Sequence, residues 1–160
     1  MKKKNITTSV IVLIIAIAGI FLISQGGASN YPHLKNSTFE MNIYKSSSCG
    51  CCGIYGNIFE SKGNSNVKII DTKNLNSLKE KNSIPNSLTS CHTTIVGDYF
   101  VEGHIPLEAI EKLLKEKPDI LGIAMPGMPS GSPGMPGSKS GDFVIYQVNN
   151  DLSVEEFMRI

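Results

Sequence analysis

The sequence predicts an α/β fold, built as one folded domain behind an apolar amino-terminal segment. Short runs of β-branched and aromatic residues alternate along the chain with segments in which apolar residues recur every three or four positions. The chain has 160 residues, of which 41% are hydrophobic and 18% charged, a composition unlike that of disordered or multi-span membrane proteins. The formal net charge of +1 provides no basic surface for nucleic acid, so nucleic-acid binding is set aside.

The amino terminus has the features of an export signal. Three lysines precede the uninterrupted apolar run Val10–Ile23, and a basic end followed by such a run directs export. The run is shorter than the roughly 20 residues of a bilayer span, and Gly26 and Ala28 offer a cleavage site. For residues 1–28, a cleaved signal peptide and a retained single-span membrane anchor therefore both stay open. In either case the positive-inside rule places the rest outside the cytoplasm, in the periplasm, on the cell surface or secreted.

Residues 29–38 are polar and predict a tether, which places the folded domain at residues 39–160. Its first element is a strand, because Phe39, Met41 and Ile43 alternate with polar neighbours, as a half-buried strand requires. A helix is expected next, after a group of cysteines, since its apolar residues form pairs four positions apart: Ile54 with Ile58, and Tyr55 with Phe59.

A second strand, a second helix and a hairpin are expected in the middle of the domain. Two β-prone runs joined by a Gly-Asp pair predict the hairpin. These elements are a strand over Val67–Ile70, a helix over Leu75–Lys81, and hairpin strands over Thr93–Val96 and Tyr99–Val101. A further helix opens at Pro106, places its leucines and isoleucine on one stripe and stops before Pro118. The resulting order, βαβαββα, is that of a thioredoxin-like fold.

The last part of the domain is expected to be a long loop and a final strand. Ile120–Gly141 is rich in proline, glycine and methionine, which disfavours regular structure, and such long loops are usually functional or disordered. Phe143–Val148 alternates as a final strand and is expected at a sheet edge. For Val154–Phe157, a helix and an extended segment both stay open.

The four cysteines are the chemically distinctive feature of the chain. Cys49, Cys51 and Cys52 lie at a strand-to-helix junction, where backbone N–H groups and the helix dipole favour thiolates. Cys91 precedes the third predicted strand, a position that packs beside this junction in a thioredoxin-like fold. Thiols outside the cytoplasm must be paired or protected, and four converging thiolates are suited to a soft metal ion. Cu(I), in one or several copies, is favoured over zinc, because adjacent Cys51 and Cys52 bridge Cu(I) ions more easily than both bind one tetrahedral zinc ion.

Two other interpretations of the cysteines stay open. Cys49 and Cys52 have the C-x-x-C spacing of a thiol-disulfide oxidoreductase, although Cys51 would compete in exchange and Thr93 stands where such enzymes usually have proline. The chain could instead be a binding module stapled by a disulfide from Cys91 to Cys49 or Cys52, although staples usually join separate parts of a chain. Whether the protein is an enzyme therefore stays undecided, and metal binding is the preferred hypothesis.

Auxiliary metal ligands or tuning groups are sought among one histidine and three methionines: His92, Met125, Met128 and Met135. The imidazole of His92 could bind metal when neutral or favour the Cys91 thiolate when cationic, or it could be a loop histidine without such a role. Thioethers bind Cu(I), but methionine also fills irregular gaps in cores. His104 is expected to make a backbone hydrogen bond near the start of the next helix, and His33 is expected in the tether.

Four motifs resemble those of the CopG-type family of extracytoplasmic metal-binding proteins, which was first catalogued as a domain of unknown function. They are Cys49-Gly50-Cys51-Cys52-Gly53, Ser90-Cys91-His92-Thr93, Glu102-Gly103-His104-Ile105-Pro106 and the loop from Met125-Pro126-Gly127-Met128-Pro129 to Gly134-Met135. The resemblance covers Met41 to Tyr146. It implies a thioredoxin-like fold, an association with copper resistance, and a Cu(I) site made of the four cysteines. Copper ions and copper-export or copper-oxidase proteins are the partners expected on this basis.

Overall fold

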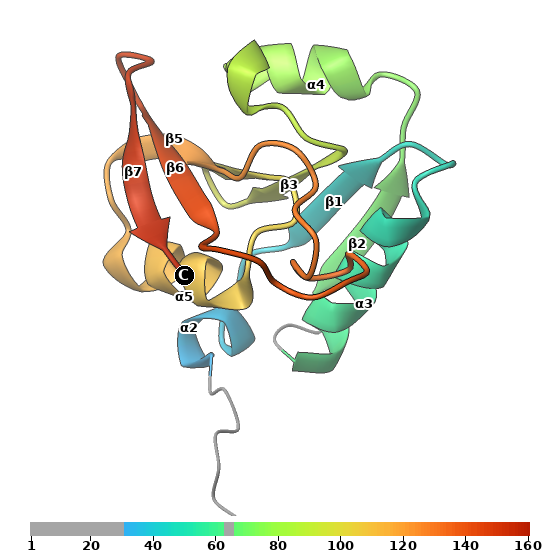
Figure 1. Ribbon diagram of the computed structural model, residues 1–160. Coiled ribbons are helices and arrows are strands. Elements are labelled where there is room, and N and C mark those ends of the chain that lie inside the picture. The colour runs from blue at the N-terminus through green and yellow to red at the C-terminus, as the bar shows by residue number, and fades with distance from the viewer. Residues whose placement is uncertain (1–30, 63–65) are drawn as a thin grey trace, which may run out of the picture. The chain divides into compact units, whose positions relative to one another are not determined.

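A seven-stranded sheet organises residues 31–62 and 66–160, which are the residues that this computed structural model describes. Its strands lie in the order β2-β1-β3-β4-β5-β6-β7 (Figure 1). They are β1 (Met41–Lys45), β2 (Val67–Asp71), β3 (His92–Val96), β4 (Tyr99–Glu102), β5 (Ile120–Ala124), β6 (Val144–Asn149) and β7 (Val154–Arg159). The helices are α2 (Pro32–Lys35), α3 (Gly50–Lys62), α4 (Leu75–Lys81) and α5 (Leu107–Glu116), with a 3-10 turn, η1 (Asn86–Leu88), before β3.

The signal peptide or membrane anchor expected over residues 1–28 lies outside the described residues. Within the described part of the chain, no helix is both long enough and apolar enough to cross a bilayer.

The predicted order of elements is present from β1 to α5: β1, α3, β2, α4, β3, β4, α5. β1 lies between β2 and β3, pairing in parallel with β2 and antiparallel with β3. β3 and β4 form the expected antiparallel hairpin. The fold is therefore a mixed α/β fold, in which a crossover helix, α3, connects the parallel strands β1 and β2.

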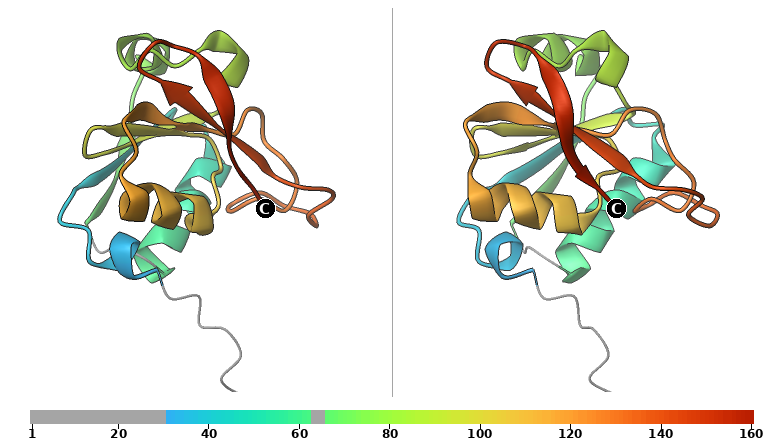
Figure 2. Two further views of the ribbon diagram at one scale, coloured as in Figure 1. Left: turned by 90° about the vertical axis from the view of Figure 1, so that its left-hand side faces the viewer. Right: turned by 60° about the vertical axis from the view of Figure 1, so that its left-hand side comes forward.

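Helices cover both faces of the sheet. Figure 2 shows α4 on one face and α2, α3 and α5 on the other. The two faces bury separate apolar clusters: Val101 packs in the larger cluster with α3 and α5, whereas neighbouring Phe100 packs in the smaller one with Ile84 and Leu88. Successive residues of a strand point to opposite faces, so β4 packs against α3 and α5 on one face and against the segment between α4 and β3 on the other.

The expectation of irregular structure from Ile120 onward is wrong for residues 120–124, which form strand β5. These residues are mostly buried, and β5 pairs in parallel with β4 and antiparallel with β6. Gly122 permits this pairing because a Cβ there would lie 2.2 Å from the carbonyl oxygen of Phe100. The proline- and glycine-rich loop therefore begins only after Ala124.

The last predicted strand is not at the edge of the sheet. β6 pairs with β5 on one side and with β7 on the other, so β7 is both the last strand and the edge. Residues 154–157, for which two conformations stayed open, are extended as part of β7. Glu155, Glu156 and Arg159 supply charges along this edge strand, and charges of this kind oppose pairing with other chains.

Residues 32–35, expected in the tether, form helix α2 and pack on α5. Leu34 is fully buried. The backbone N–H groups of His33 and Leu34 donate to the carboxylate of Glu111, at 3.1 and 2.8 Å, and the His33 Nδ1 lies 2.6 Å from the same group. A carboxylate at the start of a helix satisfies N–H groups that have no partner within the helix. The folded part of the chain therefore begins before residue 39.

Replacing Glu111 with Gln should destabilise the protein by about 1–2 kcal/mol, because charge-assisted hydrogen bonds to the first turn of α2 are lost. Burial acts to raise the pKa of Glu111, but the N–H groups and imidazole of Leu34 and His33 lower it overall. The stabilisation is therefore present above the pKa of the unfolded chain and is lost as pH falls through the lowered native pKa. Urea unfolding at several pH values measures both effects. The control is Glu116→Gln, at an exposed position of α5, the helix that also carries Glu111. Equal losses of unfolding free energy in both variants would contradict this role of Glu111.

Candidate metal centre

The cysteines converge where β1 leads into α3. A turn in which the Cys49 N–H donates to the Ser46 carbonyl, at 3.0 Å, places Cys49 directly before the helix. Cys51 and Cys52 then lie in the first turn of α3, the positive end of the helix dipole, which stabilises thiolates. Cys52 is fully buried, and the other cysteines are half-buried. Cys91 is the residue directly before β3, and its side chain lies beside this helix turn.

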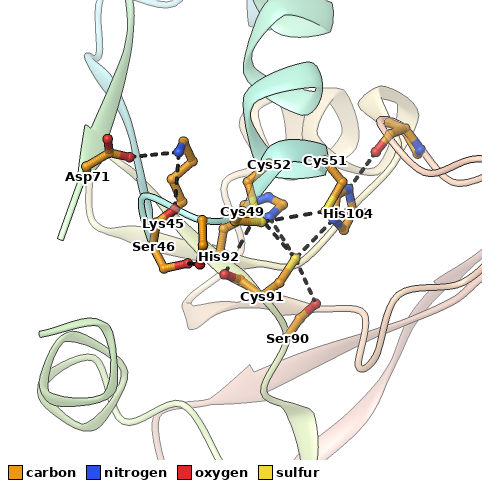
Figure 3. The surroundings of a disulfide bond; sticks show 12 residues. Lys45, Ser46, Cys49, Cys51, Cys52, Asp71, Ser90, Cys91, His92 and His104 are labelled. Atoms are coloured by element: carbon orange, nitrogen blue, oxygen red, sulfur yellow. Dashed lines mark hydrogen bonds and ion pairs between the residues drawn. A yellow bond between two sulfur atoms is a disulfide. The ribbon is translucent and has the colours of Figure 1, made fainter. Parts of the chain in front are cut away.

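All four sulfur atoms lie within 4.8 Å of one another (Figure 3). Cys49 and Cys52 are joined in a disulfide, while Cys51 and Cys91 are free. The Cys51 Sγ lies 3.6 Å from the Cys49 Sγ, and the Cys91 Sγ lies 3.5 Å from the Cys52 Sγ. Each half of the disulfide therefore has a free thiol beside it. A staple from Cys91 to Cys49 or Cys52 is not the pairing found.

Two histidines also lie close to the sulfur of Cys91 (Figure 3). The His92 Nδ1 lies 3.4 Å and the His104 Nε2 3.0 Å from the Cys91 Sγ, and both side chains are fully buried. With Cys52, these residues form a second group whose potential ligand atoms lie within 4.8 Å of one another. Cys52 and Cys91 thus belong to both groups, and Cys91 is in contact with cysteines and histidines alike.

The orientation of His104 is fixed by a backbone carbonyl. Its Nδ1 lies 2.7 Å from the carbonyl oxygen of Pro133. Because a carbonyl can only accept, Nδ1 carries the proton, and Nε2 points a lone pair at Cys91. This is the usual arrangement of a metal-binding histidine, in which an outer hydrogen bond sets the tautomer. The backbone hydrogen bond expected for His104 exists, but its other nitrogen reaches the cysteines.

Burial keeps the two histidines neutral and the Cys91 thiol protonated. Desolvation, followed by the charges of His104 and Lys79, lowers the pKa of His92 to about 3. Desolvation also lowers the pKa of His104. Burial and the neighbouring Cys51 raise the pKa of Cys91 to about 11. A cationic His92 stabilising a thiolate is therefore not what the structure shows, and a metal ion binding here would have to displace the thiol proton.

The loop after β5 covers this cluster. The Ser90 hydroxyl donates to the carbonyl of Gly127 at 2.5 Å, on one side of the cluster, and His104 holds Pro133 on the other. Gly134, directly after Pro133, has a φ of +81°, and a Cβ there would lie 2.8 Å from the backbone oxygen of Cys51. Glycine is therefore required for the loop to lie against the first turn of α3.

The chain matches solved structures over most of their length. Two structures named copper resistance protein CopG, Form 1 and Form 2, align with TM-scores of 0.69 and 0.70 at 30% sequence identity. The alignments cover 76% of this chain and 96% and 98% of the solved chains. The chain belongs to the CopG family. The resemblance inferred from the four motifs is confirmed.

The sequence comparisons agree with this membership. Residues 88–135 match a family described as "Protein of unknown function, DUF411", and no curated protein matches. The matched region of this CopG-family chain contains Cys91, both buried histidines and the first part of the covering loop, up to Met135. Together, the CopG relatives and the cysteine cluster support a function related to copper.

The three methionines of the covering loop occupy different environments. Met125 is 2% exposed and belongs to the hydrophobic core, whereas Met128 is 54% exposed and Met135 is half-buried. Met125 therefore packs as a core residue.

His104 lies in the cluster but was not among the ligands predicted from the sequence, although it stands in one of the motifs shared with the CopG family.

A buried ion pair positions the segment that carries Cys91. Glu102 is fully buried and pairs with Lys79 of α4. Its carboxylate also accepts from the backbone N–H of Ser90, at 2.5 Å, and from the Thr93 hydroxyl, at 2.6 Å. Thr93 stands where thiol-disulfide oxidoreductases usually have proline. It binds the same carboxylate as Ser90, so Glu102 holds the chain both before and after Cys91.

Replacing Glu102 with Gln should destabilise the protein by about 3–5 kcal/mol, because the buried Lys79 charge loses its partner. The loosened Ser90 should also make the Cys91 thiol react faster with iodoacetamide. Urea unfolding and alkylation kinetics measure the two effects. Glu156→Gln, at an exposed strand position paired with Arg159, should cost at most about 1 kcal/mol. A Glu102→Gln protein as stable as this control would contradict the role assigned to the pair.

Proposed function

We propose that this CopG-family protein binds Cu(I) through Cys49, Cys51, Cys52 and Cys91 once the Cys49–Cys52 disulfide is reduced, and serves in copper resistance or homeostasis. The observation that carries the proposal is the convergence of four sulfur atoms within 4.8 Å of one another. Thiolates are soft ligands, which favour Cu(I) over harder ions. Zinc is the less favoured alternative, because two of the thiols are on adjacent residues.

The arrangement favours more than one ion per chain. Cys52 and Cys91 each belong to two overlapping groups of ligand atoms, so their sulfurs are placed to bridge neighbouring ions. His92 and His104 offer nitrogen ligands close to the sulfur atoms of Cys52 and Cys91. Imidazole is a good ligand for copper, and the carbonyl of Pro133 holds His104 in the required orientation.

The protein is proposed to work outside the cytoplasm. The lysines and apolar run before residue 24 support export, with a cleaved signal peptide or a retained anchor. In an oxidising compartment, Cu(I) bound as a thiolate cluster would protect thiols that otherwise form disulfides. Copper-export or copper-oxidase proteins are the proposed partners.

Anaerobic titration of the reduced protein with Cu(I), against a competing chelator, should show more than one ion bound per chain. Cys51→Ser should lower this number, because one of the four thiolate ligands is lost. Ser47→Ala, an exposed change in the turn before Cys49, should bind as the unaltered protein does. A reduced protein that binds no copper, or a Cys51→Ser variant with unchanged stoichiometry, would exclude the cluster.

A second candidate function, thiol-disulfide exchange, is favoured by the Cys49–Cys52 disulfide itself. This pair has the spacing of redox enzymes, and the Cys91 thiol lies 3.5 Å from one of its sulfurs. An enzyme of this kind would reduce insulin with an added dithiol, would need Cys49 and Cys52, and would tolerate Cys51→Ser. We expect turnover no faster than that of the added dithiol alone, because neighbouring free thiols compete in exchange. Rapid turnover that depends on Cys49 would reverse the order of the two proposals.

A further inference from the structure

The disulfide removes two cysteines from the metal centre but leaves a set of ligands in place. Metal ions bind thiolates, so the paired Cys49 and Cys52 no longer contribute. Of the second ligand group, Cys91, His92 and His104 remain. Their facing atoms are close already: the Cys91 Sγ lies 3.0 Å from the His104 Nε2 and 3.4 Å from the His92 Nδ1. The disulfide form is therefore not without potential ligands.

The environment of these three residues is arranged for binding. The Pro133 carbonyl leaves the lone pair of His104 directed at Cys91. His92 is fully buried, and within the described residues its Nε2 has no hydrogen-bond partner. Its ring packs against Tyr55 and His104, with centroids 4.5 and 4.7 Å apart. The burial of this polar ring is therefore not explained by a hydrogen bond through Nε2. It is explained if Nδ1, which faces Cys91, serves as a metal ligand.

We propose that the disulfide form of the protein binds one d¹⁰ metal ion, Zn²⁺ or Cu(I), through the Cys91 Sγ, the His104 Nε2 and the His92 Nδ1. Three protein ligands leave the fourth position of a tetrahedral ion open. The proposal rests on the proposed function in that the ion shares Cys91 with the cysteine site. Oxidation would then reduce the capacity of the centre to a single ion rather than empty it. The remaining ligands, one thiolate and two imidazoles, are all of types that bind zinc.

Zn²⁺ is the probe for this site, because it has no redox chemistry and leaves the disulfide intact. The oxidised full-length protein, shown by alkylation to have two free thiols, is titrated with Zn²⁺ against a chromophoric chelator. One ion per chain is expected. His104→Gln should weaken binding at least about tenfold. His33→Gln is the matched control, since His33 is the remaining histidine and pairs with Glu111 on α5. No zinc bound, or equal affinity in the two variants, would overturn the proposal.

A second measurement covers the case in which His104→Gln does not fold. In the unaltered disulfide form, Zn²⁺ should slow the alkylation of Cys91 by iodoacetamide at least about tenfold, as read by peptide mass spectrometry. An unchanged rate at Cys91 would overturn the proposal even if some zinc is bound elsewhere.

The two oxidation states separate this inference from the proposed function. Reduced protein that binds several Cu(I) ions, together with oxidised protein that binds no zinc, would remove the one-ion site and keep the copper function. The reverse pattern would remove the four-cysteine copper site and keep a one-ion site of Cys91 and two histidines.

Discussion

The buried carboxylate of Glu102 is the interaction on which the candidate metal centre depends. A charge without solvent contact is tolerated only when its hydrogen bonds are satisfied. Glu102 achieves this by binding Lys79 of α4, the Thr93 hydroxyl of β3 and the Ser90 N–H before Cys91. The carboxylate of Glu102 thereby holds together helix α4, strand β3 and the segment that carries Cys91. The position of the Cys91 sulfur opposite the first turn of α3 follows from this arrangement.

The predictions from sequence succeeded where the signal was local. Alternation in Met41 and Ile43, the pairs in α3 and the Gly-Asp turn after β3 all depend on neighbouring residues. Features that depend on distant partners were missed. The short run at Ile120 becomes a strand because β4 and β6 lie on either side, and Leu34 is buried because α5 supplies Glu111 as a partner for α2.

The same distinction holds within the site. Spacing alone marked the three cysteines of the strand-to-helix junction, and the expected packing added Cys91. The role of His104 depends on Pro133, which is 29 positions away, and no local pattern reveals that contact. The methionines were considered for their chemistry, but burial assigns Met125 to the core. Residue type thus indicated the class of chemistry, while tertiary contacts determine which side chains can take part in it.

The covering loop is attached to the metal centre largely through its backbone. The carbonyl oxygens of Gly127 and Pro133 accept the hydrogen bonds, and Gly134 packs with backbone atoms of α3. Every residue, proline included, has a backbone carbonyl, so most side chains of this loop can change during evolution without moving the ligands. Gly134 cannot, because of its conformation and its close contacts. Relatives can therefore adapt the outer surface of the loop to different partners, beginning with exposed positions such as Met128, while conserving the chemistry beneath it.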